Sequence, residues 1–489
     1  MSQLTALDAQ FLHFESATTA AHVAGVAVLD PGTAPSGEIT RDSLAELLRA
    51  RMHLSPALHM RLAEVPLGLD HPYWTPDTEF DLDHHLFEST LPAPGGDREL
   101  AAEVARLHTE HLDRSRPLWE MHLIKGLSGG RVALYSKVHH AAIDGVSGAE
   151  TLATLLDFSP EQREVAPPEP ESESAAADRA SPDMRTMLSE AAVHTALQPA
   201  KMLSSLAKVA CEMDAIPVIS DIPGSRFLAS LARRASGDRR TRPELPSLHA
   251  PDVPINGPIT GTRAFAYGSV PFKDVKQVAT AFGLSVNDVI LALCASALRT
   301  WLLERDALPE QPLIVAVPVA VRASGADEHV GNQISAMITP LATQIADPAE
   351  RLRAVGEAMG TAKRRFAVAP TSWLNELCSV IPAPLTALAM PTAYRLAAKA
   401  FPPVNLIISN VPGPQFPLYL CGGRVLSYYP VSVLSDISGG LNITCFSYDG
   451  AIDFGLVTCP DLIDDGWTLM AHLHRAMDEM TGLLEQAPN

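Results

Sequence analysis

The chain has 489 residues, which is long enough for two or three domains, and 47% of them are hydrophobic, an ordinary share for a globular protein. Its formal net charge of −19 argues against a nucleic-acid-binding protein, because such proteins usually present a basic surface. The six cysteines show neither CxxC spacing nor a zinc-type cluster, so we expect a reduced, cytoplasmic compartment. The N-terminus lacks a basic stretch followed by an apolar core, so no secretory signal is expected.

In chain order, the first histidine pair is His84-His85, which follows Asp83. A pair of histidines beside an acid is more often structural than catalytic. No Asp-Gly step stands behind this pair, and we predict a structural role for it.

A second pair opens the segment His139 to Gly145, which reads HHAAIDG. Residues 131–138 alternate well enough to predict a strand, and this alternation turns His139 and His140 to opposite faces. Asp144-Gly145 is a turn signal, and a capping-box spacing follows it. Because imidazole exchanges protons near neutral pH, a general base on a strand-to-helix loop is the working hypothesis.

Composition divides the chain into three parts. The residues after 158 are rich in Pro, Glu and Ala and are too polar to form a core, and residues 184–232 look helical and apolar in patches. We therefore predict an N-terminal domain at 1–158, a linker with an apolar helical segment at 159–258, and a C-terminal domain at 259–489.

Strands and helices alternate in the C-terminal part, which predicts a mixed α/β fold without repeats. Strands are predicted at 313–321, 404–408 and 441–448, and helices at 286–303, 348–363 and 467–484.

Residues 377–394 form 18 uncharged positions, the length at which a transmembrane helix must be considered. Three prolines interrupt them, which argues against a spanning helix. Arg395 and Lys399 follow, so the segment is either an interfacial element with basic flanks or an ordinary buried helix pair.

The HHxxxDG segment resembles the signature of the CoA-dependent acyltransferase superfamily, which includes chloramphenicol acetyltransferase, carnitine acyltransferases and peptide-synthetase condensation domains. Four further blocks are similar to those of the bacterial wax ester synthase/diacylglycerol acyltransferase family. They are Leu4 to Glu15 with His22-Val23, Arg116 to Glu120 (RPLWE), Val286 to Val289 (VNDV) and Ser409 to Pro414 (SNVPGP). The blocks stand in the family's order and span nearly the whole chain.

This resemblance implies an α/β fold with two chloramphenicol-acetyltransferase-like domains, each a mixed sheet with helices, meeting at a central active-site tunnel. It also implies an O-acyltransferase that moves a long-chain fatty acyl group from acyl-CoA to diacylglycerol, a long-chain alcohol or both. Acyl-CoA is then a co-substrate, and no cofactor or metal is expected. The expected partners include a membrane surface or lipid droplet and no nucleic acid, the oligomeric state being open.

By resemblance, His140 is the general base and His139 packs or orients the loop. Asp144 looks like a structural residue that is salt-bridged to an arginine, and Gly145 allows the tight turn. Two arginines are candidates for that ion pair, Arg61 and Arg322. No GxSxG pattern is present, so direct transfer is preferred over an acyl-enzyme.

The ND block allows two interpretations. Asn287 is a candidate hydrogen-bond donor for the oxyanion of the tetrahedral intermediate. Ser285-x-x-Asp288 also has capping-box spacing, so the block could simply cap the helix that follows.

The other two blocks look mainly structural. Pro117-Leu118-Trp119 predicts a packed turn, although the aromatic side chain could line an acyl pocket. Asn410, Pro412 and Gly413 predict a rigid turn after a strand, which the resemblance makes a wall or crossover near the domain interface.

Because CoA is anionic, its binding needs a local basic patch in this acidic chain. Two clusters could supply one or could be solvated surface: Arg233, Arg234, Arg239, Arg240 and Arg242, or Lys363, Arg364 and Arg365.

Two alternatives to the acyl-CoA-dependent enzyme remain open. One is a condensation-type or polyketide-associated acyltransferase that takes its acyl group from a carrier protein. The other is a non-catalytic lipid-binding protein that coats droplets.

Overall fold

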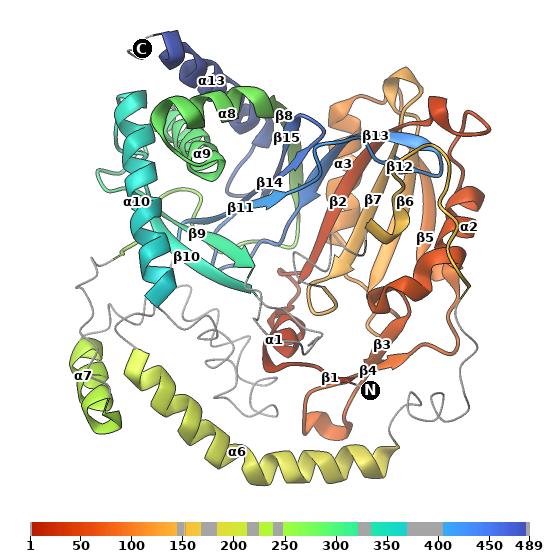
Figure 1. Cartoon of the computed structure of the whole chain (residues 1–489), viewed down its shortest axis with the longest axis horizontal. Helices are drawn as coiled ribbons and strands as arrows, with labels where there is room; N and C mark the ends of the chain where they lie inside the picture. The colour runs from red at the N-terminus through yellow and green to blue at the C-terminus, as the bar shows by residue number, and fades with distance from the viewer. Residues whose placement is uncertain are drawn as a thin grey trace.

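The computed structural model describes residues 2–143, 151, 153–167, 183–212, 224–237, 248–320, 334–368 and 404–485. These residues form two six-stranded sheets and a small three-stranded sheet. Helices pack on both large sheets (Figure 1). The mixed α/β fold predicted from the sequence is therefore confirmed.

The strands are β1 Ser2–Gln3, β2 His22–Asp30, β3 Met60–Ala63, β4 Tyr73–Pro76, β5 Leu86–Thr90, β6 Trp119–Lys125, β7 Val132–His139, β8 Ala264–Pro271, β9 Leu313–Ala320, β10 Ile334–Leu341, β11 Leu406–Pro412, β12 Tyr419–Leu420, β13 Gly423–Val431, β14 Leu441–Tyr448 and β15 Ala451–Thr458. The α-helices are α1 Ala6–Phe14, α2 Arg41–Arg51, α3 Asp97–Thr109, α6 Met184–Glu212, α7 Ser225–Ser236, α8 Phe272–Phe282, α9 Val286–Leu303, α10 Pro348–Val368 and α13 Gly466–Gly482.

The first large sheet has the order β12-β13-β2-β7-β6-β5. Its central strands are covered on both faces, so their residues are almost all apolar. Along β2, Val26 and Val28 pack in the cluster that contains α3, whereas Ala27 and Leu29 pack in the cluster that contains α2. The sheet thus fixes strand β7, which carries the histidine motif, between two antiparallel neighbours.

Buried polar side chains of this sheet include His22 of β2, His122 of β6 and, near the motif, Lys137 and His139 of β7. Lys137 is fully buried, and its ammonium group donates to the carbonyl oxygens of Leu107 at 3.2 Å and Glu110 at 2.9 Å. These carbonyls belong to the C-terminal end of α3, which has no intrahelical donors for them and attracts positive charge. Lys137 therefore fastens α3 to the strand two residues before His139.

The second large sheet has the order β10-β9-β11-β14-β15-β8. Helices α8, α9, α10 and α13 gather beside it (Figure 1), and α9 is its main core helix. By length and composition, Val286–Leu303 could cross a membrane, but 72% of this stretch is buried inside the protein. We therefore describe α9 as the core helix of the C-terminal half.

Strand β13 joins the two halves, because it belongs to the C-terminal sequence but pairs with β2 of the first sheet. Its neighbour Asp453 on β15 is buried and accepts hydrogen bonds from the Tyr428 backbone N–H at 2.8 Å and the Ser269 hydroxyl at 2.6 Å. Burial raises the pKa of Asp453 to about 6, against the effect of these hydrogen bonds. The crossover strand is thus bound to both sheets.

Several predicted elements match the structure. Helix α9 and strand β14 have the predicted bounds, and α10 runs five residues beyond the predicted end at Lys363. Residues 377–394 lie outside the described part of the chain, as does most of the polar linker. The predicted tunnel and the predicted domain boundaries stay predictions.

Candidate functional site

The histidine motif begins at the last residue of β7. The His139 backbone N–H donates to the Leu118 carbonyl at 2.9 Å, and the His140 N–H donates to the Ala21 carbonyl at 2.8 Å. The chain then turns, since the Ala142 N–H donates to the His139 carbonyl at 2.9 Å. Neighbouring strands therefore hold the backbone of both histidines from opposite sides.

The ring of His139 folds back onto this turn. Its Nδ1 accepts a hydrogen bond from the Ala141 backbone N–H at 3.0 Å. Burial lowers the pKa of His139, although Glu15 acts in the opposite direction. A neutral ring that accepts at Nδ1 carries its proton on Nε2, and Nε2 lies 3.4 Å from the Glu15 Oε1 atom.

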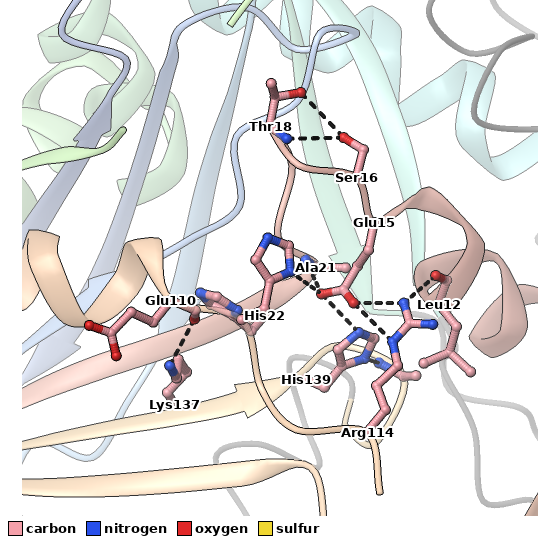
Figure 2. Close-up of polar contacts among 12 residues, drawn as sticks. Leu12, Glu15, Ser16, Thr18, Ala21, His22, Glu110, Arg114, Lys137 and His139 are labelled. Atoms are coloured by element: carbon pink, nitrogen blue, oxygen red, sulfur yellow. Dashed lines mark hydrogen bonds and ion pairs between the residues drawn. The ribbon is translucent and has the colours of Figure 1, made fainter. Parts of the chain in front are cut away.

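Glu15 contacts the motif, the segment just before β2 and the loop after α3 (Figure 2). Its Oε1 accepts from the Ala21 N–H at 3.0 Å, and its Oε2 receives two hydrogen bonds from the Arg114 guanidinium at 3.1 and 2.6 Å. Burial by itself raises the pKa of Glu15, but the contacts with His139, Ala21 and Arg114 outweigh it and lower the pKa to about 2. Glu15 is therefore a buried carboxylate that holds three segments together.

His140 points to a different place from His139, as the strand alternation predicted. Its ring stacks on Phe11 of α1, with ring centroids 4.1 Å apart and planes 5° apart. His140 is half-buried, whereas His139 is buried. The N-terminal helix thus supplies an aromatic surface that fixes the orientation of the His140 ring.

Asp144 and Gly145 lie outside the described residues, as does Arg322. The other arginine considered for Asp144, Arg61, has its Nε atom 3.6 Å from Asp77. After the motif the chain is held again at Asp157, whose carboxylate accepts from the buried Arg51 guanidinium at 2.9 and 3.0 Å.

The Pro117-Leu118-Trp119 block forms the support beneath the motif. Leu118 packs with Ala141 and Leu12 in one apolar cluster. Trp119 is buried at the start of β6, and its indole N–H donates to the Leu58 carbonyl at 2.9 Å. The block is therefore packed next to the motif, consistent with the predicted structural role.

The ND and SNVPGP blocks meet in the C-terminal half. The Asn410 Nδ2 atom donates to the Asn287 Oδ1 atom at 3.3 Å, and the Cys445 thiol lies 3.5 Å from the Asn410 Oδ1 atom. Because the Asn287 Oδ1 atom accepts from Asn410, the NH₂ group of Asn287 points away from Asn410. The sequence did not indicate that these two asparagines touch.

The capping interpretation of the ND block matches its geometry, and the oxyanion role of Asn287 stays a prediction. Ser285 and Asp288 form a capping box at the start of α9, with reciprocal hydrogen bonds of 3.3 and 2.9 Å. Asn287 takes no part in that capping box, so its side chain can serve another purpose.

The predicted turn at Asn410 to Pro414 begins later than expected. Asn410 and Pro412 belong to strand β11, which pairs in parallel with β14 as far as Pro412. Pro412 is the last strand residue, where its missing N–H costs no ladder hydrogen bond. Gly413 follows because a Cβ atom there would lie 2.3 Å from the Phe446 ring and 2.4 Å from the Ser447 carbonyl.

The basic clusters are only partly described. The Lys363 ammonium lies 3.6 Å from Asp288, beside the ND block. The Arg233 guanidinium donates to the Cys211 carbonyl at 2.7 Å, which is a structural contact between α7 and α6.

Sequence reasoning quoted Glu15 only as part of the N-terminal block and did not consider Arg114. The signal available in the sequence was that Glu15, a carboxylate far from the motif, lies inside a block that resembles the family. Its partner could not be identified from spacing, because 124 positions separate Glu15 from His139.

Comparisons with known proteins cover the whole chain. Residues 4–290 match the family model of the wax ester synthase/diacylglycerol acyltransferase catalytic domain, and residues 330–481 match the C-terminal domain of the same family. A putative diacylglycerol O-acyltransferase of Mycobacterium tuberculosis CDC 1551 is 35% identical over 100% of this chain and 92% of its own length. A probable diacylglycerol O-acyltransferase of M. tuberculosis H37Rv is 34% identical over 98% of both chains.

Among solved structures, the wax ester synthase/diacylglycerol acyltransferase of Marinobacter aquaeolei VT8 superposes with a TM-score of 0.66 at 29% identity, covering 98% of both chains. The starter condensation domain of rhizomide synthetase has a TM-score of 0.53 at 14% identity, covering 99% of this chain and 95% of that one. The second likeness concerns the fold alone.

Proposed function

Because the chain belongs to the wax ester synthase/diacylglycerol acyltransferase family and is an acyltransferase, we propose that it transfers a long-chain fatty acyl group from acyl-CoA to an alcohol. The acceptors are diacylglycerol, long-chain alcohols or both. The products are then triacylglycerol or wax ester. Acyl-CoA is a co-substrate in this reaction, and the proposal involves no cofactor or metal.

His140 is the proposed general base. An alcohol attacks a thioester poorly until its proton is removed, and a well-placed base contributes about 10² to 10⁴ in rate. His140 is half-buried and stacked on Phe11, which sets the plane of its ring. It takes the proton from the acceptor hydroxyl as the oxygen attacks the acyl carbon, and returns it to the CoA sulfur as the C–S bond breaks.

His139 and Glu15 are the proposed positioning residues for this base. The contact between Glu15 and Nε2 fixes the His139 ring, and Nδ1 of that ring accepts the Ala141 N–H directly after His140. The turn that presents His140 is thereby tied to a buried carboxylate. Asp144 and Gly145 are proposed to complete the turn.

Asn287 is the proposed oxyanion donor. Its Oδ1 atom accepts from Asn410, which leaves the NH₂ group to donate to the tetrahedral intermediate. Donors of this kind are typically worth about 2.7 to 4 kcal/mol in the transition state.

The two alternative functions predict a different acyl donor or no acyl transfer at all. A carrier-dependent condensation enzyme would need an acyl carrier protein, and a droplet-coating protein would form no ester. The observation that carries the proposal is the His140 ring, which stacks on Phe11 directly after β7, in a chain related throughout its length to diacylglycerol O-acyltransferases. We also place the protein in the cytoplasm, at a membrane surface or lipid droplet where its lipid acceptors reside.

The direct experiment offers labelled palmitoyl-CoA to the purified protein with diacylglycerol and hexadecanol in competition, and separates the two esters. We expect at least one ester without any carrier protein. Transfer only from an acylated carrier protein would favour the condensation-type enzyme. Lipid binding without any ester would favour the droplet-coating protein.

A further inference from the structure

Helices α6 and α7 pack against each other with their small and polar residues inside. The buried residues of α7 are Ser225, Ala229 and Arg233, and Ser205 of α6 is also buried. The Arg233 guanidinium donates to the Cys211 carbonyl near the end of α6. The buried residues of α7 that the structure describes are thus a serine, an alanine and an arginine, with no large apolar side chain among them.

The large apolar residues of α7 lie on its outer side instead. Phe227, Leu228 and Leu231 are 67%, 53% and 45% exposed, and we call these three residues the α7 face. The spacing of Phe227 and Leu231 puts them on one side of the helix, with exposed Arg234 three residues further on. Soluble proteins usually bury such side chains, so a contiguous exposed group marks an interaction surface.

The charge around the α7 face is opposite to that of the whole protein. Helix α7 contains three arginines, Arg226, Arg233 and Arg234, and no Asp or Glu, whereas the full chain has 37 Lys or Arg residues and 56 Asp or Glu residues. An amphipathic helix with an apolar face and local positive charge is typical of segments that lie in the interface of an anionic membrane.

The position of the two helices fits such a surface. Figure 1 shows α6 running along one edge of the molecule, with α7 beyond its C-terminal end, apart from the helices that cover the second sheet. The start of α6 is fixed to the N-terminal half, because the Tyr73 hydroxyl donates to Glu190 and His194 lies 2.6 Å from Asp70. α7 is thus presented at the far end of an anchored helix.

We propose that the α7 face docks the protein on an anionic phospholipid surface. The three apolar side chains enter the headgroup and acyl boundary, and the exposed Arg234 faces the lipid phosphates. The choice of a lipid surface as the occupant rests in part on the proposed function, because diacylglycerol and long-chain alcohols are reached there.

The test is flotation of the full-length protein with phosphatidylcholine vesicles, with and without phosphatidylglycerol. We expect binding to the vesicles that contain phosphatidylglycerol. The variant Phe227→Ser/Leu228→Ser/Leu231→Ser should reduce the partition coefficient at least about tenfold, since each exposed side chain loses its apolar transfer. Arg234→Glu should weaken binding to these vesicles roughly fivefold or more.

The matched control is Leu54→Ser/Leu303→Ser/Leu426→Ser, which removes three leucines of 43%, 49% and 42% exposure on other elements. This control should bind vesicles like the unsubstituted protein. Equal binding by the α7 variant, equal loss in the control, or no binding by the unsubstituted protein would overturn the proposal. So would a protein that self-associates through the α7 face, as shown by sedimentation, without binding vesicles.

A parallel assay separates this proposal from the proposed enzymatic function. Transfer from acyl-CoA to a water-soluble short-chain alcohol, measured without vesicles, should be the same in the α7 variant and the unsubstituted protein. If neither transfers an acyl group but only the unsubstituted protein floats, docking stands and the proposed function fails.

Discussion

Each of the two histidine pairs of the N-terminal half has one buried and one more exposed member, but their surroundings differ. In the first pair His85 is buried and His84 is exposed, and in the second His139 is buried and His140 is half-buried. His85 donates to the Trp119 carbonyl at 2.8 Å and stacks between Phe80 and Trp119. His139 instead contacts the carboxylate of Glu15 and the backbone of its own turn.

This difference shows what turns a histidine pair into a candidate catalytic element. His85 is satisfied by backbone and apolar rings, which fits a purely structural side chain. His139 links the turn that carries His140 to the ion pair of Glu15 and Arg114. His84 lies 3.7 Å from an exposed aspartate, whereas His140 is stacked on an aromatic ring of another element.

The largest expected effect distinguishes the more exposed histidine of each pair, His140 and His84. His140→Ala should lower kcat for ester formation by about 10² to 10⁴, because it removes the proposed base. The matched change His84→Ala should leave kcat unchanged. Labelled palmitoyl-CoA with an alcohol acceptor measures both, and circular dichroism checks that both variants are folded. Full activity in His140→Ala would refute the proposed mechanism.

Glu15→Gln tests whether the buried carboxylate positions the turn. We expect the unfolding free energy to fall by about 1 to 3 kcal/mol, because the Ala21 N–H and the His139 ring lose a charged acceptor, whereas Arg114 is exposed enough to be solvated. We also expect kcat to fall about 10- to 100-fold with little change in KM, since a small shift of the base is costly. Denaturant unfolding and steady-state kinetics give the two values.

The control for this change is Glu88→Gln, which removes a half-exposed ion pair with Lys125 at 2.9 Å and should alter neither value appreciably. If Glu15→Gln lost stability but kept its kcat in the folded fraction, Glu15 would be structural only.

The pH dependence of stability gives a further way to isolate Glu15. Burial raises its pKa, and the stronger contacts with His139, Ala21 and Arg114 lower the pKa to about 2, below the ordinary 4.5. Its contribution is therefore fully present above about pH 4.5 and is lost as the pH falls towards 2. The difference in unfolding free energy between the unsubstituted protein and Glu15→Gln should shrink over that window. A difference independent of pH would contradict this account.

The smallest effect is expected at the buried member of the first pair. His85→Leu should reduce the unfolding free energy by about 1 to 3 kcal/mol, because the Trp119 carbonyl loses its donor. Its kcat should stay normal, whereas His139→Leu should lower both stability and kcat. The kcat values of His85→Leu and His139→Leu should be compared at a temperature where both variants are folded. Equal losses of kcat would contradict the distinction between the two buried histidines.

Sequence patterns predicted those features that depend on local order. Helix α9 has a capping box at its start and a continuous apolar run, and β14 is a short alternating strand, so their bounds were found. The opposite directions of His139 and His140 followed from strand alternation. The end of β11 was placed too early, because a turn signal was given more weight than pairing with a strand formed 35 residues later.

The contacts that sequence reasoning could not supply all link distant segments. Glu15 meets His139 because α1 folds back beside β7, and Asn287 meets Asn410 because the start of α9 lies beside β11. Neither pair has a characteristic spacing. The pairing of β13 with β2 likewise depends on the whole fold.

That pairing has a consequence for biosynthesis. Val26 of β2 finds its partner Tyr429 of β13 roughly 400 residues later, so the first sheet is incomplete until most of the chain has left the ribosome. During that interval β2 presents an unpaired edge, the kind of surface that promotes aggregation. Expression of the N-terminal half alone should therefore give poorly soluble protein, and co-expression with a segment that contains β12 and β13 should improve its yield.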